Sequence, residues 1–335
     1  MRANRVVAVE SGAGRGSGYV VAPRLVLTSA HVTPAVGQPV TVFAVGTAAA
    51  AAGRVVWRGV PGGRDDAALV EVVDDPAWQT REGPAPRWGR VVTNRPGIGC
   101  AAWGFPQWVQ RGDRAAETWQ PHGTLNPGNR YVGDRYVLSL VSHPPAPADD
   151  DRSPWAGLSG AALFCGDLLT GVMAVDPAGG WHAHLEAVPM YVLGRDPAFG
   201  RILTTHGAAD LVLDPVEAQQ LVLSEPPVGR SPAALLRPRQ QIVGFRGREQ
   251  SLADLQAWSQ PSGFAAWLVH GPAGQGKTRL AQEFASRLAR QRWACLWLRG
   301  DAPADALAVL GDAAVPLLVI VDYAETRVDQ VAAVL

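Results

Sequence analysis

Short apolar runs, rich in valine, recur between residues 5 and about 190 and are separated by glycine, proline and aspartate. Strands this short and this evenly spaced predict an antiparallel barrel or sandwich. No pattern in this region keeps a helical period for more than about two turns. The runs that we expect to be strands are Arg5–Glu10, Gly18–Ala22, Leu25–Ser29, Pro39–Val45, Ala67–Val73, Ile98–Trp103, Tyr136–Val141, Gly160–Cys165, Gly171–Val175 and His182–Val188.

The pattern then changes, first to a helix and afterwards to a looser segment. Asp196 followed by Pro197 is typical of a helix N-cap and first helical position, and predicts a helix that ends near Thr205. Residues 206–240 contain EPPVGR and RPRQQ and keep no sustained period. We expect an interdomain linker there, with one short helix that begins at Ser231-Pro232.

Helical and strand patterns alternate in the remainder of the chain. The expected elements are helices over Gln250–Trp258 and Thr278–Arg290 and buried strands over Ala265–His270, Trp293–Leu298 and Leu317–Val321. This order predicts a parallel sheet with crossover helices. The chain therefore divides into an all-β domain over residues 1–205, the linker over 206–240, and an α/β domain over 241–335.

Length and charge narrow the class of protein. The 335 residues suffice for about two domains, each with its own core. Acidic and basic residues balance at 30 each, so the net charge gives no reason to expect a nucleic acid or a membrane surface as partner. The longest apolar run, Val315–Val321, is far shorter than the roughly 20 residues of a membrane span. Because the N-terminal residues contain no apolar signal-peptide core, we expect a cytoplasmic protein.

The cysteines and histidines outside the motifs below do not predict a metal site. Cys100, Cys165 and Cys295 are widely spaced, and we expect free, buried thiols in a reducing compartment. His182 and His184 flank Ala183, and strand alternation would place both on one exposed face. A metal would need further ligands close by, so we interpret them as paired surface histidines.

Three segments of the β region carry side chains that serve nucleophilic catalysis when they meet. His31 follows a strand pair in GSGYVVAPRLVLTSAHV, Asp66 precedes a buried strand in RDDAALVEV, and Ser159 lies between glycines in PWAGLSGAALF. A serine hydroxyl becomes a strong nucleophile when an imidazole takes its proton, and that imidazole needs a buried carboxylate. A lone histidine after a strand is usually structural. The order His, Asp, Ser in an all-β region is that of the chymotrypsin fold.

Glycines beside the serine predict an oxyanion hole. They allow a sharp turn that aims the N–H groups of Gly157 and Ser159 at one point. Such donors stabilise the developing oxyanion, and losing one commonly costs about 3–4 kcal/mol.

Residues 1 to about 205 resemble the trypsin-like (chymotrypsin-fold) serine peptidases, especially the bacterial type without disulfides. The matching segments are GSGYVV, LVLTSAHV, DAALV, CAAWGFP, GLSGAAL and LLTGVMAV. The resemblance implies two β-barrels with the active site between them and a protein or peptide substrate. It also implies His31 as base, Asp66 as orienting acid and Ser159 as nucleophile. Asp66 fits the family pattern of Asp, apolar residue, Ala, Leu better than Asp65 does.

Departures from that family concern the substrate. Leu158 precedes the serine and Gly160-Ala161-Ala162 follow it, where the family has other residues. In the family the side chain six positions before the serine often lies at the base of the specificity pocket, and here it is Ser153. We therefore expect a small or apolar residue before the scissile bond. The run Asp149-Asp150-Asp151 is expected to be a solvated loop, and a contact with basic substrates stays open.

GPAGQGKT, from Gly271 to Thr278, is a complete Walker A motif and contains the only lysine among 30 cationic side chains. It lies between an expected strand and an expected helix, as a phosphate loop requires. Gly271, Gly274 and Gly276 let backbone N–H groups wrap the phosphates, and the helix N-terminus adds its dipole. Lys277 would reach the β and γ phosphates as a point charge that the planar arginine side chain does not mimic.

A second acidic strand completes the expected nucleotide site. In LLVIVDYAE a buried strand leads to Asp322, whose carboxylate would hold Mg²⁺ together with Thr278. ATP and Mg²⁺ are therefore the expected cofactors of this domain, and the peptidase domain needs none.

IVGFRGREQSLADLQAW, GPAGQGKT and LLVIVDYAE together resemble the start of the AAA-related STAND NTPases, which are regulatory switch ATPases of signalling and defence proteins. The resemblance implies that Gly247, Arg248 and Glu249 lie near the base of the nucleotide. Tyr323 stands where many members have a second acidic residue, and Glu325 is the nearest candidate to orient water. It therefore implies nucleotide binding more firmly than hydrolysis. Because the sequence ends soon after this motif, we expect only the N-terminal part of such a domain.

Together the two motifs predict a cytoplasmic serine endopeptidase coupled to an ATP-binding switch, with a possible homo-oligomer through the NTPase domain. One alternative is a non-catalytic peptide-binding or scaffold protein regulated by nucleotide, which a broken triad would favour. Another is an ATP-driven protease that unfolds its substrate, which would need an aromatic pore loop that the sequence does not show.

Overall fold

The computed structural model describes residues 1–46, 50–73, 78, 85–110, 116–142, 153–177, 182–208, 211–223, 245–261 and 263–335. The short helix expected at Ser231-Pro232 and the acidic run Asp149–Asp151 lie outside these residues.

The N-terminal strands form a closed barrel with the order β1-β2-β3-β6-β5-β4. Valines at alternate positions, such as Val7 and Val9, fill its interior, whereas Val6 and Ala8 pack on its outer face against the rest of the protein. Burial on both faces explains why this region reads as nearly continuous apolar runs. The strands are β1 (Val6–Ser11), β2 (Gly14–Ala22), β3 (Leu25–Thr28), β4 (Pro39–Ala44), β5 (Ala50–Arg58) and β6 (Ala68–Val72).

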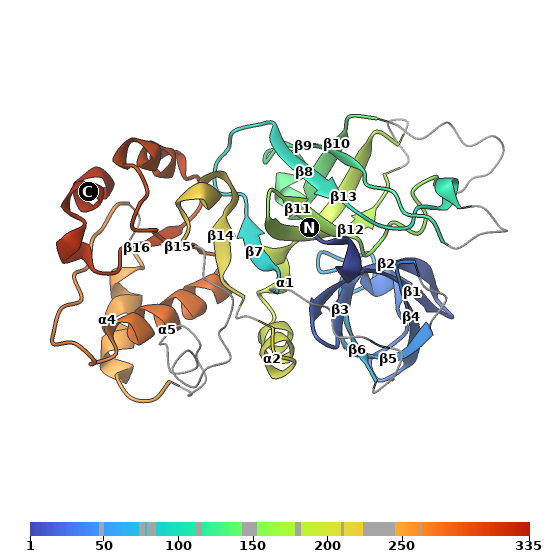
Figure 1. Cartoon of the computed structure of the whole chain (residues 1–335), viewed down its shortest axis with the longest axis horizontal. Helices are drawn as coiled ribbons and strands as arrows, with labels where there is room; N and C mark the ends of the chain where they lie inside the picture. The colour runs from blue at the N-terminus through green and yellow to red at the C-terminus, as the bar shows by residue number, and fades with distance from the viewer. Residues whose placement is uncertain are drawn as a thin grey trace.

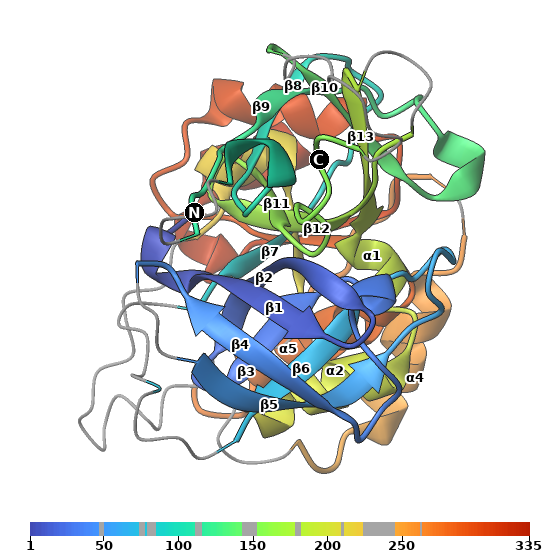
Figure 2. The same ribbon diagram turned by 90° about the vertical axis from the view of Figure 1, so that its right-hand side faces the viewer.

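A second sheet has the order β11-β8-β9-β10-β13-β12-β7-β14, and an added pairing of β11 with β12 closes its first six strands into a ring. The two barrels predicted from the sequence are therefore confirmed, and Figure 2 shows the first barrel below the second. The strands are β7 (Arg87–Arg90), β8 (Ile98–Ala102), β9 (His122–Leu125), β10 (Tyr136–Leu140), β11 (Ala162–Cys165), β12 (Leu168–Val175), β13 (His184–Pro189) and β14 (Leu213–Pro215).

Short helices complete the barrels, and the predicted helix after Asp196 is confirmed as α2 (Pro197–Thr205). The Asp196 carboxylate accepts a hydrogen bond from Ala198 N at 2.8 Å and another from Trp57 Nε1 at 2.7 Å, which ties the helix to the first barrel. The other short elements are α1 (Met190–Leu193), η1 (Ala3–Arg5), η2 (Ala30–Val32), η3 (Gln107–Val109) and η4 (Tyr131–Gly133).

The expected linker is partly ordered structure. β14 pairs in parallel with β7, and η5 (Val216–Leu221) follows it directly. Leu221 and Val222 are buried with Leu296 and Leu298 of the C-terminal region. Residues 213–222 therefore join the two domains by packing, whereas 224–240 lie outside the described residues.

The C-terminal region contains a two-stranded parallel sheet, β15 (Ala294–Trp297) and β16 (Leu317–Ile320), packed against helices (Figure 1). Leu280, Phe284 and Leu288 recur at four-residue spacing on α5 and are buried in one cluster with residues of α4 and β15. Within the described residues, no helix is both long and apolar enough to cross a membrane. The remaining elements are α4 (Glu249–Trp258), α5 (Lys277–Arg290), η7 (Ala304–Asp312), η8 (Ala324–Thr326) and α6 (Val328–Val334).

One predicted strand of this region is wrong. Residues 265–270 are irregular and mostly exposed, not a buried strand. A strand exists only where a neighbour completes its hydrogen bonds, and β15 and β16 pair with each other and not with this segment.

The prediction of three free cysteines is also wrong. Cys100 and Cys165 form a disulfide between β8 and β11, whose register pairs Phe164 with Ala101 and so brings the next residues opposite each other. Their separation of 65 residues in sequence gave no sign of this pairing. Cys295 is free and buried as expected, and burial raises the pKa of its thiol.

Candidate active site

A histidine–carboxylate pair is assembled at the edge of the first barrel. After β3, the turn η2 carries His31, whose Nδ1 lies 2.8 Å from Asp66 Oδ2. The second oxygen, Asp66 Oδ1, accepts a hydrogen bond from His31 N at 3.0 Å. Asp65 points elsewhere and accepts from Val60 N at 3.1 Å. Asp66 is therefore the residue that fixes the imidazole.

The Asp66 carboxyl is held in its charged form. Burial by itself would raise its pKa, but the hydrogen bonds and charge of His31 and the amide of Gly62 outweigh burial and lower the pKa below the ordinary value. A charged Asp66 accepts the Nδ1 proton of His31. That leaves Nε2, on the opposite side of the ring, as the nitrogen that can take a proton from a nucleophile.

Ser159 lies in a tight turn at the entry to β11. Gly157 and Gly160 have φ angles of +88° and +90°, and an added Cβ would lie 2.5 Å from Phe105 O and 2.0 Å from Ser17 O respectively. Both positions therefore require glycine, because neither the backbone conformation nor the space admits a side chain.

A side chain that sequence reasoning missed, Ser17 of β2, holds this turn. Ser17 N donates to Ser159 O at 2.7 Å, and Ser17 Oγ donates to Gly157 O at 2.7 Å. Ser17 belongs to the GSGYVV segment, so the motif was noticed, but nothing in it indicated a contact with a turn 140 residues away.

One carbonyl connects the two halves of the site. Met173 O accepts hydrogen bonds from Ser29 Oγ and from Gly160 N, both at 2.7 Å. Ser29 lies two residues before His31, and Gly160 directly follows Ser159. The segments that carry the imidazole and the hydroxyl thus meet at the boundary between the barrels.

The Ser159 hydroxyl itself donates to Ala174 O, at 3.4 Å, and within the described residues no hydrogen bond joins it to His31. The amides of Gly157 and Ser159 have no hydrogen-bond partner in the part of the chain that the structure describes. The His–Asp contact is thus formed, the two amides are unengaged, and the Ser–His contact is not formed.

A cavity of about 200 Å³ adjoins Ser159. Ser153 lines it, as the resemblance implied, and donates a hydrogen bond to Asp176, which also lines it. The other lining residues are mostly apolar: Trp155, Ala156, Leu158, Met173, Ala174, Val175 and Leu185.

The expected pair of surface histidines is only half right. His184 is exposed on β13, but His182 precedes the strand in the left-handed conformation, with φ +58°. Its Nδ1 lies 2.6 Å from Asp176 Oδ2, and its side chain is only 20% exposed. Strand alternation does not apply at His182, which is why the two side chains diverge.

The phosphate-loop residues lie together at the start of α5. Gly274 and Gly276 adopt left-handed φ angles of +77° and +76°, and an added Cβ at either would meet nothing within 4 Å. Lys277 Nζ donates to Gly271 O at 2.7 Å and to Pro272 O at 3.0 Å, so the lysine folds over the loop. Gly274 and Gly276 thus have free space around them, and the Lys277 ammonium group lies against the loop carbonyls.

The two residues expected to hold Mg²⁺ are adjacent. Thr278 Oγ1 lies 3.3 Å from Asp322 Oδ2, although the two residues are 44 positions apart. Within the described residues, no group of three His, Cys, Asp or Glu side chains could hold a metal without a nucleotide.

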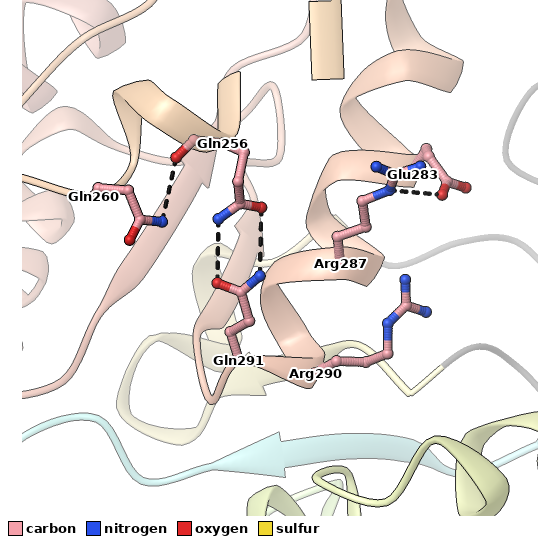
Figure 3. A pocket seen from close by; sticks show the side chains of 6 residues that line it. All are labelled: Gln256, Gln260, Glu283, Arg287, Arg290 and Gln291. Carbon is pink, nitrogen blue, oxygen red and sulfur yellow. Dashed lines mark hydrogen bonds and ion pairs between the residues drawn. The ribbon is translucent and has the colours of Figure 1, made fainter. Parts of the chain in front are cut away.

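A larger open groove of about 560 Å³ lies between α4 and α5. Figure 3 shows its polar lining, in which the amides of Gln256 and Gln291 bond each other and Glu283 pairs with Arg287. The groove follows the later turns of α5, whereas the phosphate loop precedes the first turn. It belongs to neither candidate site.

No protein-family model matches the chain, and no curated protein matches it. Among solved structures, the protease Rv3671c (inactive form) matches with 18% identity and a TM-score of 0.39, over 62% of this chain and 90% of that chain. That protein comes from M. tuberculosis. A Glu endopeptidase matches with 16% identity and a TM-score of 0.38, over 55% of this chain and 83% of that chain. The thermostable serine protease AL20 from an extremophilic microorganism matches with 14% identity and a TM-score of 0.40, over 56% and 91%. Because identities and scores are low, the assignment of two barrels depends on the strand pairings themselves.

Proposed function

We propose that the chain is a serine endopeptidase that uses His31, Asp66 and Ser159. The observation that carries the proposal is the pairing of His31 with the buried Asp66 carboxylate, connected through the Met173 carbonyl to the turn that bears Ser159. In the proposed reaction His31 Nε2 takes the Ser159 proton as Oγ attacks the peptide carbonyl. His31 then protonates the leaving amine, and water hydrolyses the acyl-enzyme by the same sequence of proton transfers.

The remaining groups assist this reaction. Asp66 stabilises the charged imidazole, and the unengaged amides of Gly157 and Ser159 donate to the oxyanion. The Ser159 hydroxyl has to turn from the Ala174 carbonyl toward His31. Such contacts are often loose without substrate and tighten in the complex.

Cleavage of a quenched-fluorescence peptide library tests the activity. We expect the wild-type chain to cleave library members and Ser159→Ala and His31→Ala to lose the activity, while all three keep the same far-UV circular dichroism. Equal cleavage by Ser159→Ala would refute the proposed nucleophile. A folded wild type that binds peptides without cleaving any would instead support the peptide-binding alternative.

We further propose that the C-terminal region binds MgATP. Lys277 and the loop amides would hold the phosphates, and Thr278 and Asp322 would hold Mg²⁺, which neutralises phosphate charge. The open loop and the Thr278–Asp322 contact fit this role. Arg248 donates to the Gln275 carbonyl of the loop, which supports the expectation that the Gly247–Glu249 segment adjoins the nucleotide.

Calorimetric titration with MgATP tests this second proposal. We expect the wild type to bind MgATP and both Lys277→Ala and Lys277→Arg to lose binding. The loop accommodates the compact ammonium group of lysine but not the planar guanidinium group of arginine. Unchanged affinity in Lys277→Ala would exclude the site.

A chain of contacts supports coupling between the two sites. Beyond the end of α5, Arg292 Nη2 donates to Asp134 Oδ1 at 2.7 Å. Arg135, which follows Asp134 in the chain, donates a hydrogen bond to the Gly63 carbonyl. The same carbonyl accepts a hydrogen bond from Asp66 N at 3.3 Å. The phosphate loop thus lies at one end of α5, and Arg292, just beyond the other end, contacts Asp134, whose neighbour Arg135 contacts the segment before Asp66. We propose that nucleotide binding alters peptidase activity along this path.

Assembly through the NTPase region, a signalling or defence role and a cytoplasmic location complete the proposal. ATP binding is the reason to place the protein in the cytoplasm. This reason replaces the argument from free cysteines, which the Cys100–Cys165 disulfide removes.

A further inference from the structure

The cavity beside Ser159 contains one carboxylate that the sequence did not indicate. Asp176 directly follows β12 and lines the cavity together with Ser159 and Ser153. Ala174, two residues earlier, accepts the Ser159 hydroxyl proton in a 3.4 Å hydrogen bond. A short segment therefore connects the proposed nucleophile to this acid.

Asp176 is buried, and only one of its oxygens is used. Its side chain is 7% exposed. Oδ2 accepts hydrogen bonds from Ser153 Oγ and from His182 Nδ1, the latter at 2.6 Å. Oδ1 is buried and has no hydrogen-bond partner among the described residues.

Ser153 and His182 fix the position of the Asp176 carboxylate, but they leave its Oδ1 without a hydrogen bond. Ser153 Oγ accepts from Trp155 N at 3.0 Å, so its own proton is directed to Asp176. His182 Nδ1 must carry a proton to bond Oδ2, and neither this contact nor that of Ser153 supplies a donor to Oδ1. No lysine or arginine is among the described residues that line the cavity. A buried carboxylate oxygen without a donor is unfavourable, and a ligand that brings a cation would remove that cost.

We propose that Asp176 is a specificity-determining residue, which selects a basic side chain for the residue before the scissile bond. This inference builds on the proposed peptidase function. The apolar lining accepts the aliphatic stem of such a side chain, and Asp176 Oδ1 accepts a hydrogen bond from its charged end. The acid comes from the end of β12 and not from the position six residues before the serine, where Ser153 stands. The proposal replaces the expectation of a small or apolar residue, which considered Ser153 alone and stays untested.

Only one oxygen of Asp176, Oδ1, lacks a hydrogen-bond donor among the described residues, and this limits which basic side chain fits best. Because Oδ2 already accepts two hydrogen bonds, a guanidinium cannot bind both oxygens in the two-pronged manner that favours arginine. A lysine ammonium needs only one acceptor in a fixed place. Lysine reagents should therefore react at least as fast as arginine reagents.

Peptidyl diphenylphosphonates that differ only in one side chain test this directly. Lysine and norleucine share the same carbon chain and differ in the ammonium group, so their ratio isolates the contact with Asp176. The rate of covalent labelling of Ser159 in the full chain is measured by intact mass for the wild type, Asp176→Asn and Asp167→Asn. Asp167 lies exposed in the turn between β11 and β12 and controls for the loss of one charge.

We expect the lysine reagent to label the wild type and Asp167→Asn about tenfold faster than norleucine, or more. Asp176→Asn should abolish or reverse that ratio, and a small fluorophosphonate, which places no side chain in the cavity, measures the reactivity of Ser159 separately in each variant. Norleucine reacting as fast as lysine in the wild type, or an unchanged ratio in Asp176→Asn, would overturn the assignment. If even the fluorophosphonate fails to label the wild type, the peptidase proposal itself fails.

Discussion

The two candidate sites are built in opposite ways. The His31–Asp66–Ser159 site takes its residues from three distant segments, and closed barrels on both sides hold them. The phosphate loop is one continuous segment from Gly271 to Thr278, and the residues before it are irregular and exposed. The phosphate loop can thus be recognised from a local sequence motif, whereas the His31–Asp66 pair forms only through long-range strand pairing. Substitutions should therefore act through packing at the first site and through direct ligand contacts at the second.

The largest effect is expected on catalysis at the barrel site. Asp66→Asn keeps the shape of the side chain but changes the proton pattern around His31, and a loss of about 10⁴-fold in kcat is expected for such a change. Asp65→Asn should change kcat little, because Asp65 contacts Val60 and not His31. Peptide cleavage by the two variants measures the difference, and equal losses would show that Asp66 is not the orienting acid.

Glycine substitutions compare the two sites for stability. Gly160→Ala places a Cβ 2.0 Å from Ser17 O at φ +90°, and we expect the free energy of unfolding to fall by about 3 kcal/mol or more. Gly274→Ala has a similar φ of +77° but open space, so about 1 kcal/mol is expected. Urea denaturation followed by tryptophan fluorescence compares them. Equal losses of unfolding free energy in the two variants would contradict the proposed difference between the packed Ser159 turn and the phosphate loop.

Arg292→Gln tests whether the two sites communicate. Removing its ion pair with Asp134 should break the proposed path from α5 to Asp66. MgATP should change the rate of fluorophosphonate labelling of the wild type by about fivefold or more, and that of the variant by less than about twofold. Arg290→Gln, in the groove at the end of α5, is the matched control and should respond like the wild type. If MgATP changes the labelling rate of Arg292→Gln as much as that of the wild type, the proposed path from α5 to Asp66 is wrong.

Acid should weaken the barrel site through Asp66. Because its pKa is lower in the folded than in the unfolded chain, its stabilising contribution is complete above the ordinary carboxyl pKa of about 3.9. The contribution is lost as the pH falls through the folded value. The difference in urea midpoint between wild type and Asp66→Asn should therefore be largest near neutral pH and shrink as the pH falls below about 4. A difference that does not depend on pH would contradict the assigned charge state.

Much of the barrel could be predicted because apolar alternation and turn residues are local signals. β5 was missed, because its first five residues are alanines, glycine and arginine. Its burial alternates along the strand, but the hydrophobicity of these residues does not. The reverse error occurred at residues 265–270, where an apolar run has no strand beside it. Hydrophobicity therefore indicates that a segment could become a strand, and the partner decides whether it does.

The candidate residues divide along the same line. Lys277 and Thr278 are adjacent in a motif, and His31, Asp66 and Ser159 each stand in a recognisable segment. Asp176 and His182 belong to no motif, and Ser17 stands in GSGYVV without any sign of the contact that it makes. All three gain their roles from contacts made across the fold. The Cys100–Cys165 pairing also arises only from the register of β8 and β11. Sequence patterns therefore reveal the reacting groups and leave out the groups that hold them.

Fluorophosphonate labelling of the full chain, read by intact mass and by the modified peptide, tests the central claim most directly. The account predicts a single adduct on Ser159 that disappears in Ser159→Ala and is strongly reduced in His31→Ala. It also predicts that Asp65→Asn labels like the wild type. A folded chain that shows no adduct on Ser159, with or without MgATP, would contradict the assignment of a serine peptidase site.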